Sequence, residues 1–385
     1  MALLDHYAQQ LEQLKQSGNL RQFKPNQQQD AYIEIAGQRM LNLSSNDYLG
    51  LAADLTLREA FLDLQPLARC YFSSSSSRLL TGNFAEYEQF EHTLSEAFGG
   101  RAALLFNSGY HMNIGILPAL ADAKTLILAD KLVHASMIDG IRLSSAKYVR
   151  YRHNDLAHLE KLLTQYHDDD QFDRIIIVTE SIFSMDGDET DLKALVSIKK
   201  RFSKTMLYVD EAHAIGVRGE LGLGCAEQYG VIQDIDCLVG TFGKALASVG
   251  GYLICDPILR TYLINTMRPL IFSTALPPIS IAWTHFVWSK MLHAQQQRTH
   301  LAAISEHLQR AVVAKGYSSP SSSHIVPIIV GESQAAVDQS KRVQDCGFYA
   351  MPVRPPTVPQ HSARLRISLT SMIQLHDLDR LVSCL

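Results

Sequence analysis

Seven short apolar runs recur between residues 102 and 255, and each has the length of a buried strand. Segments with helical periodicity separate several of them, as at Leu156, Leu159 and Leu163. Strands that alternate with helices predict right-handed crossovers and a mainly parallel sheet with helices on both faces. The predicted strands are 102–106, 125–129, 147–151, 175–179, 206–209, 237–241 and 251–255. The expected fold class is therefore α/β, with one large domain built on a seven-stranded sheet.

The pattern differs on both sides of this region. Apolar residues at three- and four-residue steps predict an amphipathic helix over 2–17, and two short strands follow it. Near the other end, a long helical stretch over 279–315 leads to β-like segments around one further helix. The expected parts are an N-terminal helix with short strands at 1–49, a large domain at 50–284 and a small α+β domain at 285–385.

Composition narrows the class of protein. Hydrophobic residues make up 46% and charged residues 19%, which is typical of a packed globular chain. The net charge is −4 without a basic run, so nucleic acid is not an expected partner. The chain starts without the features of a signal peptide, and its apolar runs are too short to span a membrane. Six scattered cysteines without a C-x-x-C pair predict reduced thiols in a cytoplasmic protein, with neither a disulfide framework nor a metal site.

A lysine follows the predicted strand 237–241 after three residues. Open α/β sheets bind ligands beyond the carboxyl ends of their strands, where a desolvated Lys244 amine can attack a carbonyl group. Thr241 and the backbone near Gly243 can donate hydrogen bonds to an anion. A lysine for an imine beside a phosphate donor is what a pyridoxal phosphate site requires. The T-F-G-K motif alone favours an ordinary surface lysine, so the other motifs decide between the two interpretations.

An acidic motif, Y-V-D-E-A-H, ends the preceding predicted strand at 208–213. A buried acid is costly unless it is paired, so the motif is compatible with a metal site or a satisfied ion pair. The other interpretation places Asp210 beneath a pyridine nitrogen and His213 beside the phenolic oxygen of the same ring. Because Asp210 and Lys244 each follow a strand of one sheet, the two together favour the cofactor.

Further candidates follow other predicted strands. A glycine turn at Gly109 precedes a helix, whose first backbone N–H groups can bind phosphate. His134 is either a core histidine or an imidazole that stacks on the ring, and Ser184 lies near the same edge of the sheet. Arg364 and Arg366 share one face of an alternating strand. Either both form surface ion pairs, or one pairs bidentately with a substrate carboxylate.

Two polar loops complete the set of candidates. Residues 44–50 favour turns, and they form either a plain loop or a polar lip that contributes Asn46 to a small-molecule site. Five serines at 73–77 lie between apolar residues and lead into a predicted helix over 84–98. This setting favours an ordered loop near a ligand over a flexible linker.

Taken together, these motifs resemble the α-oxoamine synthases, a family of fold-type I pyridoxal phosphate enzymes. The resemblance extends from about residue 21 to the end of the chain. Its motifs are S-S-N-D-Y-L-G at 44–50, H-A-S at 134–136, E-S-I-F-S-M-D-G-D at 180–188, V-D-E-A-H at 209–213, T-F-G-K at 241–244 and R-L-R-I-S at 364–368. The chain departs from the family at 73–77, where members usually have a glycine-rich run. Serine lacks the freedom of glycine at positive φ, so the departure bears on the path of this loop and on its acyl-donor contacts.

The resemblance implies a decarboxylating condensation of an amino acid with an acyl thioester, performed by a homodimer with shared active sites. It implies that the catalytic residues are Lys244, which binds the cofactor and takes the α-proton, Asp210, which holds the pyridinium, and His134, which stacks on the ring. The other implied cofactor contacts are His213 and Ser184 at the phenolic oxygen, Gly109, Tyr110 and Thr241 at the phosphate, and Thr274 at the phosphate of the neighbouring subunit. The implied substrate contacts are Arg366 and Asn46 at the amino-acid carboxylate, Arg21 near the acyl donor, and Thr357.

The stretch V-R-P-P-T-V-P at 353–359 bears on the substrates. It resembles the family member that condenses L-alanine with a pimeloyl thioester in biotin synthesis, and the thioester is carried on coenzyme A or on acyl carrier protein. The alternatives are another synthase of the family, such as a glycine acetyltransferase, and a non-catalytic partner subunit. Such subunits tend to lack the lysine, which is present here. A dinucleotide-dependent dehydrogenase is disfavoured, because no G-x-G-x-x-G follows the first predicted strand.

Overall fold

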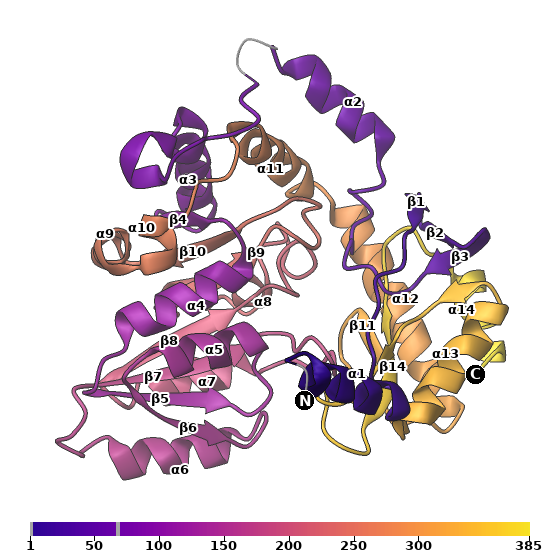
Figure 1. Ribbon diagram of the computed structural model, residues 1–385. Helices are drawn as coiled ribbons and strands as arrows, with labels where there is room; N and C mark the ends of the chain where they lie inside the picture. The colour runs from indigo at the N-terminus through magenta and orange to yellow at the C-terminus, as the bar shows by residue number, and fades with distance from the viewer. Residues whose placement is uncertain (1–2, 67–69) are drawn as a thin grey trace. The chain divides into compact units, whose positions relative to one another are not determined.

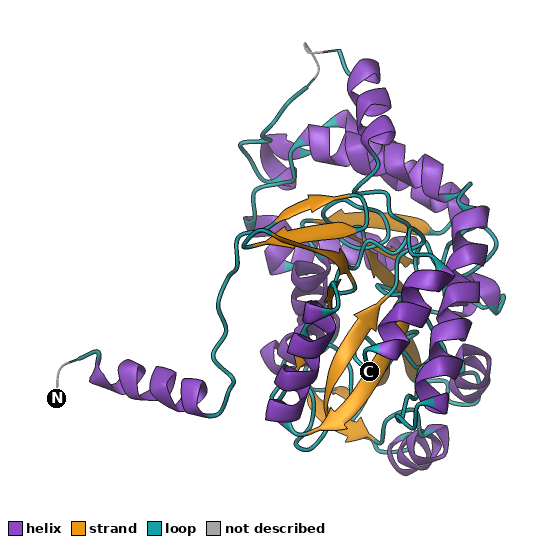
Figure 2. Cartoon of the chain, turned by 90° about the vertical axis from the view of Figure 1, so that its right-hand side faces the viewer, coloured by secondary structure: helices purple, strands orange, loops and turns teal. Residues whose placement is uncertain are grey.

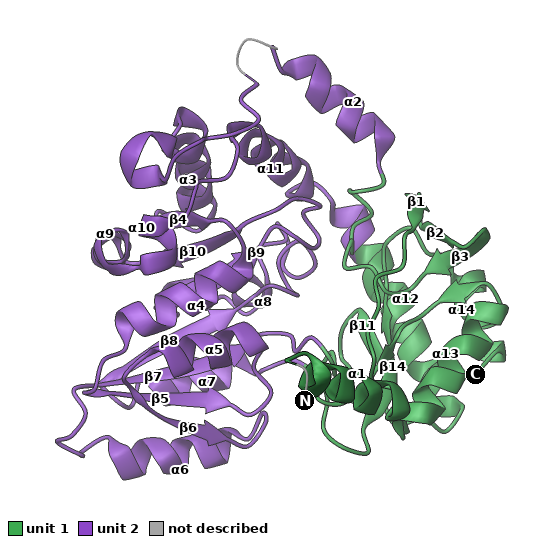
Figure 3. Cartoon of the chain, in the orientation of Figure 1, with its two compact units in different colours: residues 1–53, 185–188, 299–385 green, residues 54–184, 189–298 purple. Residues whose placement is uncertain are grey.

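The computed structural model describes residues 3–66 and 70–385, and the chain forms two compact units (Figure 3). Unit 1 comprises residues up to 53, residues 185–188 and residues 299–385. Unit 2 comprises residues 54–184 and 189–298. The N-terminal segment thus belongs to the same compact unit as the C-terminal part of the chain. Domain limits after residues 49 and 284 stay a prediction.

Unit 2 is built on a seven-stranded sheet (Figure 1). Its strands are β4 (Ala102–Phe106), β5 (Thr125–Asp130), β6 (Lys147–Tyr151), β7 (Arg174–Glu180), β8 (Thr205–Asp210), β9 (Cys237–Thr241) and β10 (Gly251–Cys255). Their order is β4-β10-β9-β8-β7-β5-β6, and only β10 runs antiparallel to its neighbours. The prediction of an α/β fold with a seven-stranded, mainly parallel sheet is confirmed.

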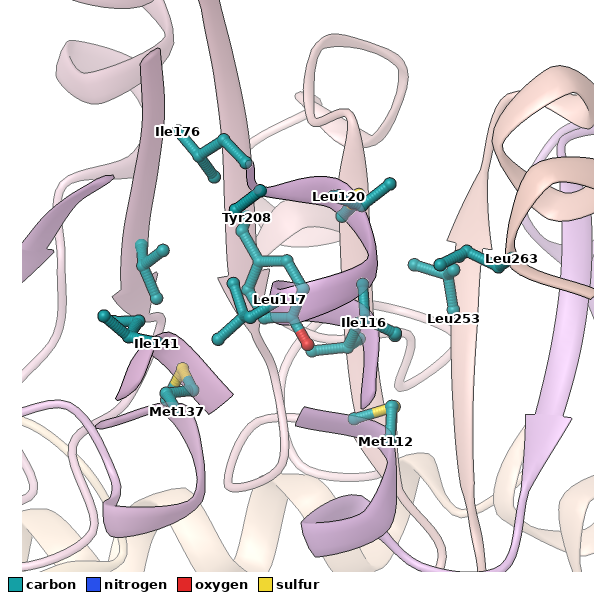
Figure 4. Packing of buried hydrophobic residues seen from close by; sticks show 14 of the residues in the cluster. Met112, Ile116, Leu117, Leu120, Met137, Ile141, Ile176, Tyr208, Leu253 and Leu263 are labelled. Carbon is teal, nitrogen blue, oxygen red and sulfur yellow. The ribbon is translucent and has the colours of Figure 1, made fainter. Parts of the chain in front are cut away.

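Helices cover both faces of this sheet. Alternate side chains of each strand point to opposite sides, so both faces carry apolar side chains that helices can bury. On one face, Ile127, Ile176 and Tyr208 belong to a single apolar cluster with residues of α4 (Gly109–Leu120) and α5 (Ala135–Leu143). Figure 4 shows Ile176 and Tyr208 in this cluster. Their neighbours Leu126, Ile175 and Leu207 are equally buried but lie outside that cluster, on the other face. The helices of unit 2 include α2 (Leu55–Leu64), α3 (Ala85–Ala97), α4 (Gly109–Leu120), α5 (Ala135–Leu143), α6 (Leu156–Tyr166), α7 (Leu192–Lys199), α8 (Cys225–Gln228), α9 (Pro257–Thr266), α10 (Arg268–Phe272) and α11 (Pro278–Met291).

Side-chain caps fix where several of these helices begin. Ser108 accepts a hydrogen bond from the backbone N–H of His111 at the start of α4, and Asp155 and Asp191 cap α6 and α7 in the same way. A capping oxygen satisfies one N–H group that has no partner within the helix. The start of α4 is therefore fixed directly after β4, at the edge of the sheet where ligands bind in folds of this kind.

Unit 1 joins the two ends of the chain through small sheets. The strands β1 (Gln27–Gln29), β2 (Tyr32–Ile35) and β3 (Gln38–Asn42) form an antiparallel meander, and β12 (Phe348–Tyr349) adds to β3 in parallel. The second sheet has the order β11 (Ile325–Gly331), β14 (Ala363–Ser368) and β13 (Pro352–Val353). The helices are α1 (Asp5–Gln16), α12 (Gln295–Ala314, which begins in unit 2), α13 (Ser333–Asp345) and α14 (Leu375–Ser383).

Helix α1 confirms the helix predicted near the N-terminus, and a loop joins it to β1 (Figure 2). None of its side chains is buried. The stretch predicted as one helical region over 279–315 contains the two helices α11 and α12, with a break at Leu292. Among residues 3–66 and 70–385, no helix is long and apolar enough to cross a membrane.

Glu211 fastens the loop after β8 to the start of α8. Its fully buried carboxyl group accepts hydrogen bonds from the backbone N–H groups of Cys225 at 3.0 Å and Ala226 at 2.7 Å. It also lies 2.5 Å from the hydroxyl of Ser181. Burial raises the pKa of Glu211 to about 7, because the removal of water disfavours the charged form more than these donors favour it. The folded chain therefore prefers this carboxyl group neutral.

This preference predicts a pH dependence of stability. Because the folded pKa lies above the unfolded value of 4.5, the stabilisation is complete below pH 4.5 and is lost as the pH rises towards 7. Glu211 alone should lower the free energy of unfolding by up to about 3 kcal/mol over this window. Glu211→Gln, which does not ionise, should lack that loss. Urea unfolding can be followed by the fluorescence of Trp283 and Trp288, which both lie in α11.

Exposed Glu96 supplies the matched control, because Glu96→Gln removes a carboxylate from the surface of the same unit. That variant should keep the pH dependence of the wild type. If Glu211→Gln and the wild type lose the same free energy of unfolding between pH 4.5 and pH 7, the buried carboxyl group does not control this stability.

Candidate active site

A pocket of about 250 Å³ lies at the carboxyl ends of β7, β8 and β9 in unit 2. The starts of α4 and α5 contribute the rest of its lining. Its residues are Ser108, Gly109, Tyr110, Met112, Asn113, His134, Ser136, Glu180, Asp210, Ala212, His213, Gly240, Thr241 and Lys244. A hollow of about 630 Å³ between α2, α3 and α11 is larger, but the described residues that line it include no lysine. The chemistry predicted from the sequence thus converges on the smaller pocket.

Lys244 reaches this pocket from the loop that follows β9. Its Nζ lies 2.8 Å from Nε2 of His213, which is buried. The loop turns sharply, because Thr241 Oγ1 accepts the backbone N–H of Gly243 at 3.2 Å and Ala247 N–H donates to the carbonyl of Lys244 at 2.9 Å. The amine is thereby held inside the pocket, beside an imidazole, and in position to attack a bound aldehyde.

Asp210 ends β8 and is 5% exposed. One carboxylate oxygen accepts the backbone N–H of Ala212 at 2.9 Å, and the other accepts Nδ2 of Asn113 at 2.9 Å. Each oxygen therefore has a donor that favours the charged form. A fixed carboxylate in a pocket of this kind can hold a proton on a ring nitrogen.

His134 caps the start of α5. The backbone N–H of Ser136 donates to its Nδ1 at 3.2 Å, and the hydroxyl of Ser136 lies 2.8 Å from the same nitrogen. A backbone N–H is only a donor, so Nδ1 is an acceptor and the ring carries its proton on Nε2. Burial lowers the pKa of His134, which also favours the neutral ring. A neutral imidazole is suited to stack on an aromatic ring.

Glu180 ends β7 next to Asp210 on β8. It accepts the backbone N–H of His134 at 2.6 Å and so fixes the loop that carries the histidine. Burial and the charge of Asp210 raise the pKa of Glu180 well above its usual range. The side chain thus acts as a structural clamp in its neutral form.

The start of α4 forms an anion cradle. The pocket is lined by Gly109 and Tyr110, the first residues of that helix, where backbone N–H groups have no partner within the helix. A Cβ atom on Gly109 would lie 3.4 Å from Cβ of Thr241, so the helix start and the end of β9 approach closely. The hydroxyl of Thr241 donates to the carbonyl of Gly250 at 2.9 Å, so it must turn to donate to an anion. This donor set fits a phosphate group.

Two predicted contacts of unit 2 lie outside the lining of this pocket. Ser184 is one of them, and its predicted role at the phenolic oxygen stays a prediction. Thr274, predicted to serve the neighbouring subunit, is the other, and its carbonyl accepts Nδ2 of Asn107 at 2.7 Å.

The serine loop at 73–77 is fastened to the segment after Thr274. The buried hydroxyl of Ser74 donates to the carbonyl of Ala275 at 2.7 Å, and the backbone N–H of Ala275 donates to the carbonyl of Ser76 at 2.9 Å. Ser75 has a φ of 50°, in the region that glycine adopts most readily. A serine therefore takes the left-handed conformation within the loop where family members have glycines.

The predicted substrate residues form two groups within unit 1. Both terminal nitrogens of Arg366 lie 3.2 Å from Oδ1 of Asn46, which also accepts the hydroxyl of Tyr48 at 3.0 Å. Arg21 donates to the hydroxyl of Thr357 at 3.1 Å. Arg366 thus contacts Asn46, and Arg21 contacts Thr357, while their roles towards a substrate stay predictions.

Arg364 lies on the same strand as Arg366 but differs in its surroundings. It is buried, forms an ion pair with Asp186 and donates to the carbonyl of Met185 at 3.3 Å. Arg366 is only half-buried and contacts the uncharged groups of Asn46 and Tyr48. Arg364 therefore forms an ion pair, which is buried and not on the surface as that interpretation had it, and Arg366 remains the candidate for a substrate carboxylate.

Four polar residues of the pocket had no function assigned from the sequence: Ser108, Asn113, Ser136 and Glu180. Ser136 and Glu180 lie within motifs quoted above, but their contacts depend on the positions of neighbouring strands. Asn113 lies between apolar residues of α4. A polar side chain on a buried helix face needs hydrogen-bond partners, and this was the sequence signal that could have indicated a role for Asn113.

Comparisons with known proteins identify the family of this chain. The family model for aminotransferase class I and II matches residues 38–385. A Pasteurella multocida protein named putative 8-amino-7-oxononanoate synthase is 54% identical over 384 residues, which cover 100% of this chain and 99% of that protein. The 8-amino-7-oxononanoate synthase of Haemophilus ducreyi is 54% identical over 390 residues, which cover 99% of this chain and 100% of that protein.

Solved structures show the same fold. A serine palmitoyltransferase from S. paucimobilis, with pyridoxal phosphate and myriocin bound, has a TM-score of 0.90 and 27% identity over 100% of this chain and 97% of that one. The 8-amino-7-oxononanoate synthase of Francisella tularensis has a TM-score of 0.77 and 28% identity, and the match covers 90% of this chain and 96% of that one. The chain therefore belongs to the aminotransferase class I and II family and, within it, to the α-oxoamine synthases that use pyridoxal phosphate, as its motifs predicted.

Proposed function

We propose that this chain condenses L-alanine with a pimeloyl thioester and releases carbon dioxide and the free thiol. The product is 8-amino-7-oxononanoate, an intermediate of biotin biosynthesis. The observation that carries this proposal is the meeting of Lys244, Asp210 and a helix N-terminus in one pocket. The similarity to relatives named 8-amino-7-oxononanoate synthase over the full length of the chain supports the choice of substrates.

The residues of the pocket fit pyridoxal phosphate. When bound, this cofactor supplies a sink for the electrons left on the α-carbon of an amino acid. In the proposed roles, Lys244 holds the cofactor covalently, and its Nζ later takes the α-proton of alanine. The Asp210 carboxylate keeps a proton on the ring nitrogen, and the neutral His134 stacks on the ring. His213 and Ser184 serve the phenolic oxygen.

Phosphate binding is proposed for the backbone N–H groups of Gly109 and Tyr110 and for the hydroxyl of Thr241. Three N–H or O–H donors at a helix start suit a dianion. Unit 1 is proposed to bind the substrates. Arg366, oriented by Asn46, pairs with the alanine carboxylate, and Arg21 with Thr357 contacts the acyl donor.

A homodimer with shared sites is part of this proposal, with Thr274 serving the phosphate of the partner subunit. Exposed apolar side chains support an interface on unit 2, because a partner would cover them. Phe72 is 73% exposed, Leu80 is 80% exposed and Phe272 is 70% exposed. A cytoplasmic location stays a prediction from the sequence.

Substrate pairs test the reaction. The purified chain with pyridoxal phosphate should release thiol and carbon dioxide from L-alanine and pimeloyl coenzyme A or pimeloyl acyl carrier protein. Its kcat/KM should be at least about 10-fold lower with glycine and acetyl coenzyme A, because the acyl chain contributes binding energy. Faster turnover of glycine with acetyl coenzyme A would favour a glycine acetyltransferase instead.

Lys244→Ala is the decisive variant for this assay. It should lose the visible absorbance of the bound cofactor and lower kcat by at least about 1,000-fold, because the amine is both the attachment point and the base. Lys193→Ala, an exposed lysine of α7, is the matched control and should keep both properties. A colourless wild type would rule out the proposed function.

Arg366→Ala should weaken the use of L-alanine. A charge-assisted hydrogen bond contributes about 1.5–3 kcal/mol, so kcat/KM for alanine should fall roughly 10- to 100-fold, mainly through KM. Arg364→Ala should instead lower the stability of unit 1, because it leaves Asp186 without its guanidinium partner. Steady-state kinetics and urea unfolding of both variants separate these effects. Equal KM values for alanine in Arg366→Ala and the wild type would exclude the proposed role of Arg366.

Sedimentation equilibrium tests the dimer. The proposed homodimer should have about twice the chain mass of 42.9 kDa at concentrations where the enzyme is active. Phe72→Glu places a charge in the exposed apolar region and should shift the protein towards the monomer, whereas Glu96→Gln should not. An active protein with the mass of a single chain would exclude shared sites.

A further inference from the structure

Asn113 is a buried amide on the apolar face of α4. It is 2% exposed, and its neighbours Met112, Ile116 and Leu117 pack against the sheet (Figure 4). A buried amide destabilises the fold unless its donors and acceptor are hydrogen-bonded. All three positions are occupied here, because Oδ1 accepts the hydroxyl of Tyr208 at 2.5 Å while Nδ2 donates to Asp210 Oδ2 and to Ser136 Oγ, each at 2.9 Å.

The partners leave the amide only one orientation. The Asp210 carboxylate is an acceptor, so the atom that faces it must be the nitrogen of Asn113. Tyr208 then meets the amide oxygen and acts as the donor, and burial raises the pKa of Tyr208 well above its usual range, which keeps its proton in place. The hydroxyl of Tyr208 thus fixes the amide, and the amide fixes the acid.

The second N–H of Asn113 connects the acid to the histidine. It donates to Oγ of Ser136, and this oxygen lies 2.8 Å from Nδ1 of His134. Because Nδ1 is an acceptor, the hydroxyl hydrogen of Ser136 points towards it. One amide therefore holds both Asp210, which is proposed to lie at the ring nitrogen, and the serine that supports the stacking histidine.

We propose that Asn113 is a positioning residue that keeps the proton shared by Asp210 and the cofactor on the ring nitrogen; this inference rests on the proposed function. Two N–H donors, from Asn113 and Ala212, stabilise the negative charge of the carboxylate. Without the Asn113 donor, the carboxylate binds the shared proton more tightly, and the ring loses part of its positive charge. The Lys244 nitrogen that is attached to the cofactor then keeps its own proton to a higher pH.

The test uses the full chain loaded with pyridoxal phosphate and needs no turnover. The visible absorbance of the bound cofactor is recorded against pH for the wild type, Asn113→Ala and Tyr208→Phe. The pH at the midpoint of the absorbance change should rise in Asn113→Ala by up to about one unit, because the loss of one hydrogen bond to a charged group shifts the proton affinity of Asp210 by at least that much and only part of the shift reaches Lys244. Tyr208→Phe should move the transition in the same direction by less, because Asn113 keeps its bonds to Asp210 and Ser136 and only its oxygen loses a donor.

Tyr252→Phe is the matched control. Tyr252 is buried in the same sheet, and its hydroxyl has no hydrogen-bond partner among the described residues. This variant should titrate like the wild type. A purely structural role of Asn113 would lower the fraction of chain that binds cofactor, without a change in the transition of the loaded fraction.

The outcomes separate the two proposals. If the wild type takes up pyridoxal phosphate and both Asn113→Ala and Tyr208→Phe titrate at the wild-type pH, the role of Asn113 is wrong and the proposed function stands. If the wild type forms no covalent attachment at Lys244, both proposals are wrong. If Asn113→Ala does not fold, Tyr208→Phe decides, because it removes a single oxygen from a packed ring.

Discussion

A buried negative charge at the end of β8 is the constraint on which the rest of this site depends. An ionised carboxylate with 5% exposure destabilises the fold by several kcal/mol unless donors surround it. Asp210 obtains one donor from the loop that follows its own strand and one from α4. The contact from Asn113 exists only when α4 packs on the sheet with this side chain facing β8. The packing of that helix and the charge of the site are therefore specified by the same residues.

The parallel arrangement of the central strands explains why motifs far apart in the sequence meet. β7, β8 and β9 are adjacent and point the same way, so Glu180, Asp210 and Thr241 reach one edge of the sheet. Antiparallel β10 joins β9 to β4, which brings the start of α4 to Thr241. A lysine amine, a carboxylate and a helix start then share one pocket of about 250 Å³. The strand order therefore brings these groups together in space, which no single sequence motif could show.

The sequence predicted the strands of unit 2 well because strands buried on both faces appear as uninterrupted apolar runs. Lys244, Asp210, His134 and His213 were found because each follows such a run, where a polar side chain is conspicuous. Other features depend on tertiary contacts that spacing does not carry. Alternation placed Arg364 and Arg366 on one face, and they are distinguished by tertiary contacts, with Asp186 for Arg364 and with Asn46 for Arg366. Residues 348–353 have the pattern of one β-like segment, but they form two short strands that join different sheets, a division that only their partners reveal.

The hydrogen bonds of the pocket also indicate different roles for its titratable groups in the proposed function. His134 uses Nδ1 to cap α5, so that nitrogen does not accept a substrate proton while the helix start is intact. Glu180 holds the backbone of His134, and burial keeps its carboxyl group neutral. Asp210 is committed to its two N–H donors and, in the proposed complex, to the ring. Lys244, carried on a loop beside His213 and not on a strand, is the side chain best placed to move a proton at the α-carbon. In the proposed function, fixed groups therefore hold the cofactor, while the proposed base, Lys244, has a long, flexible side chain that allows it to move.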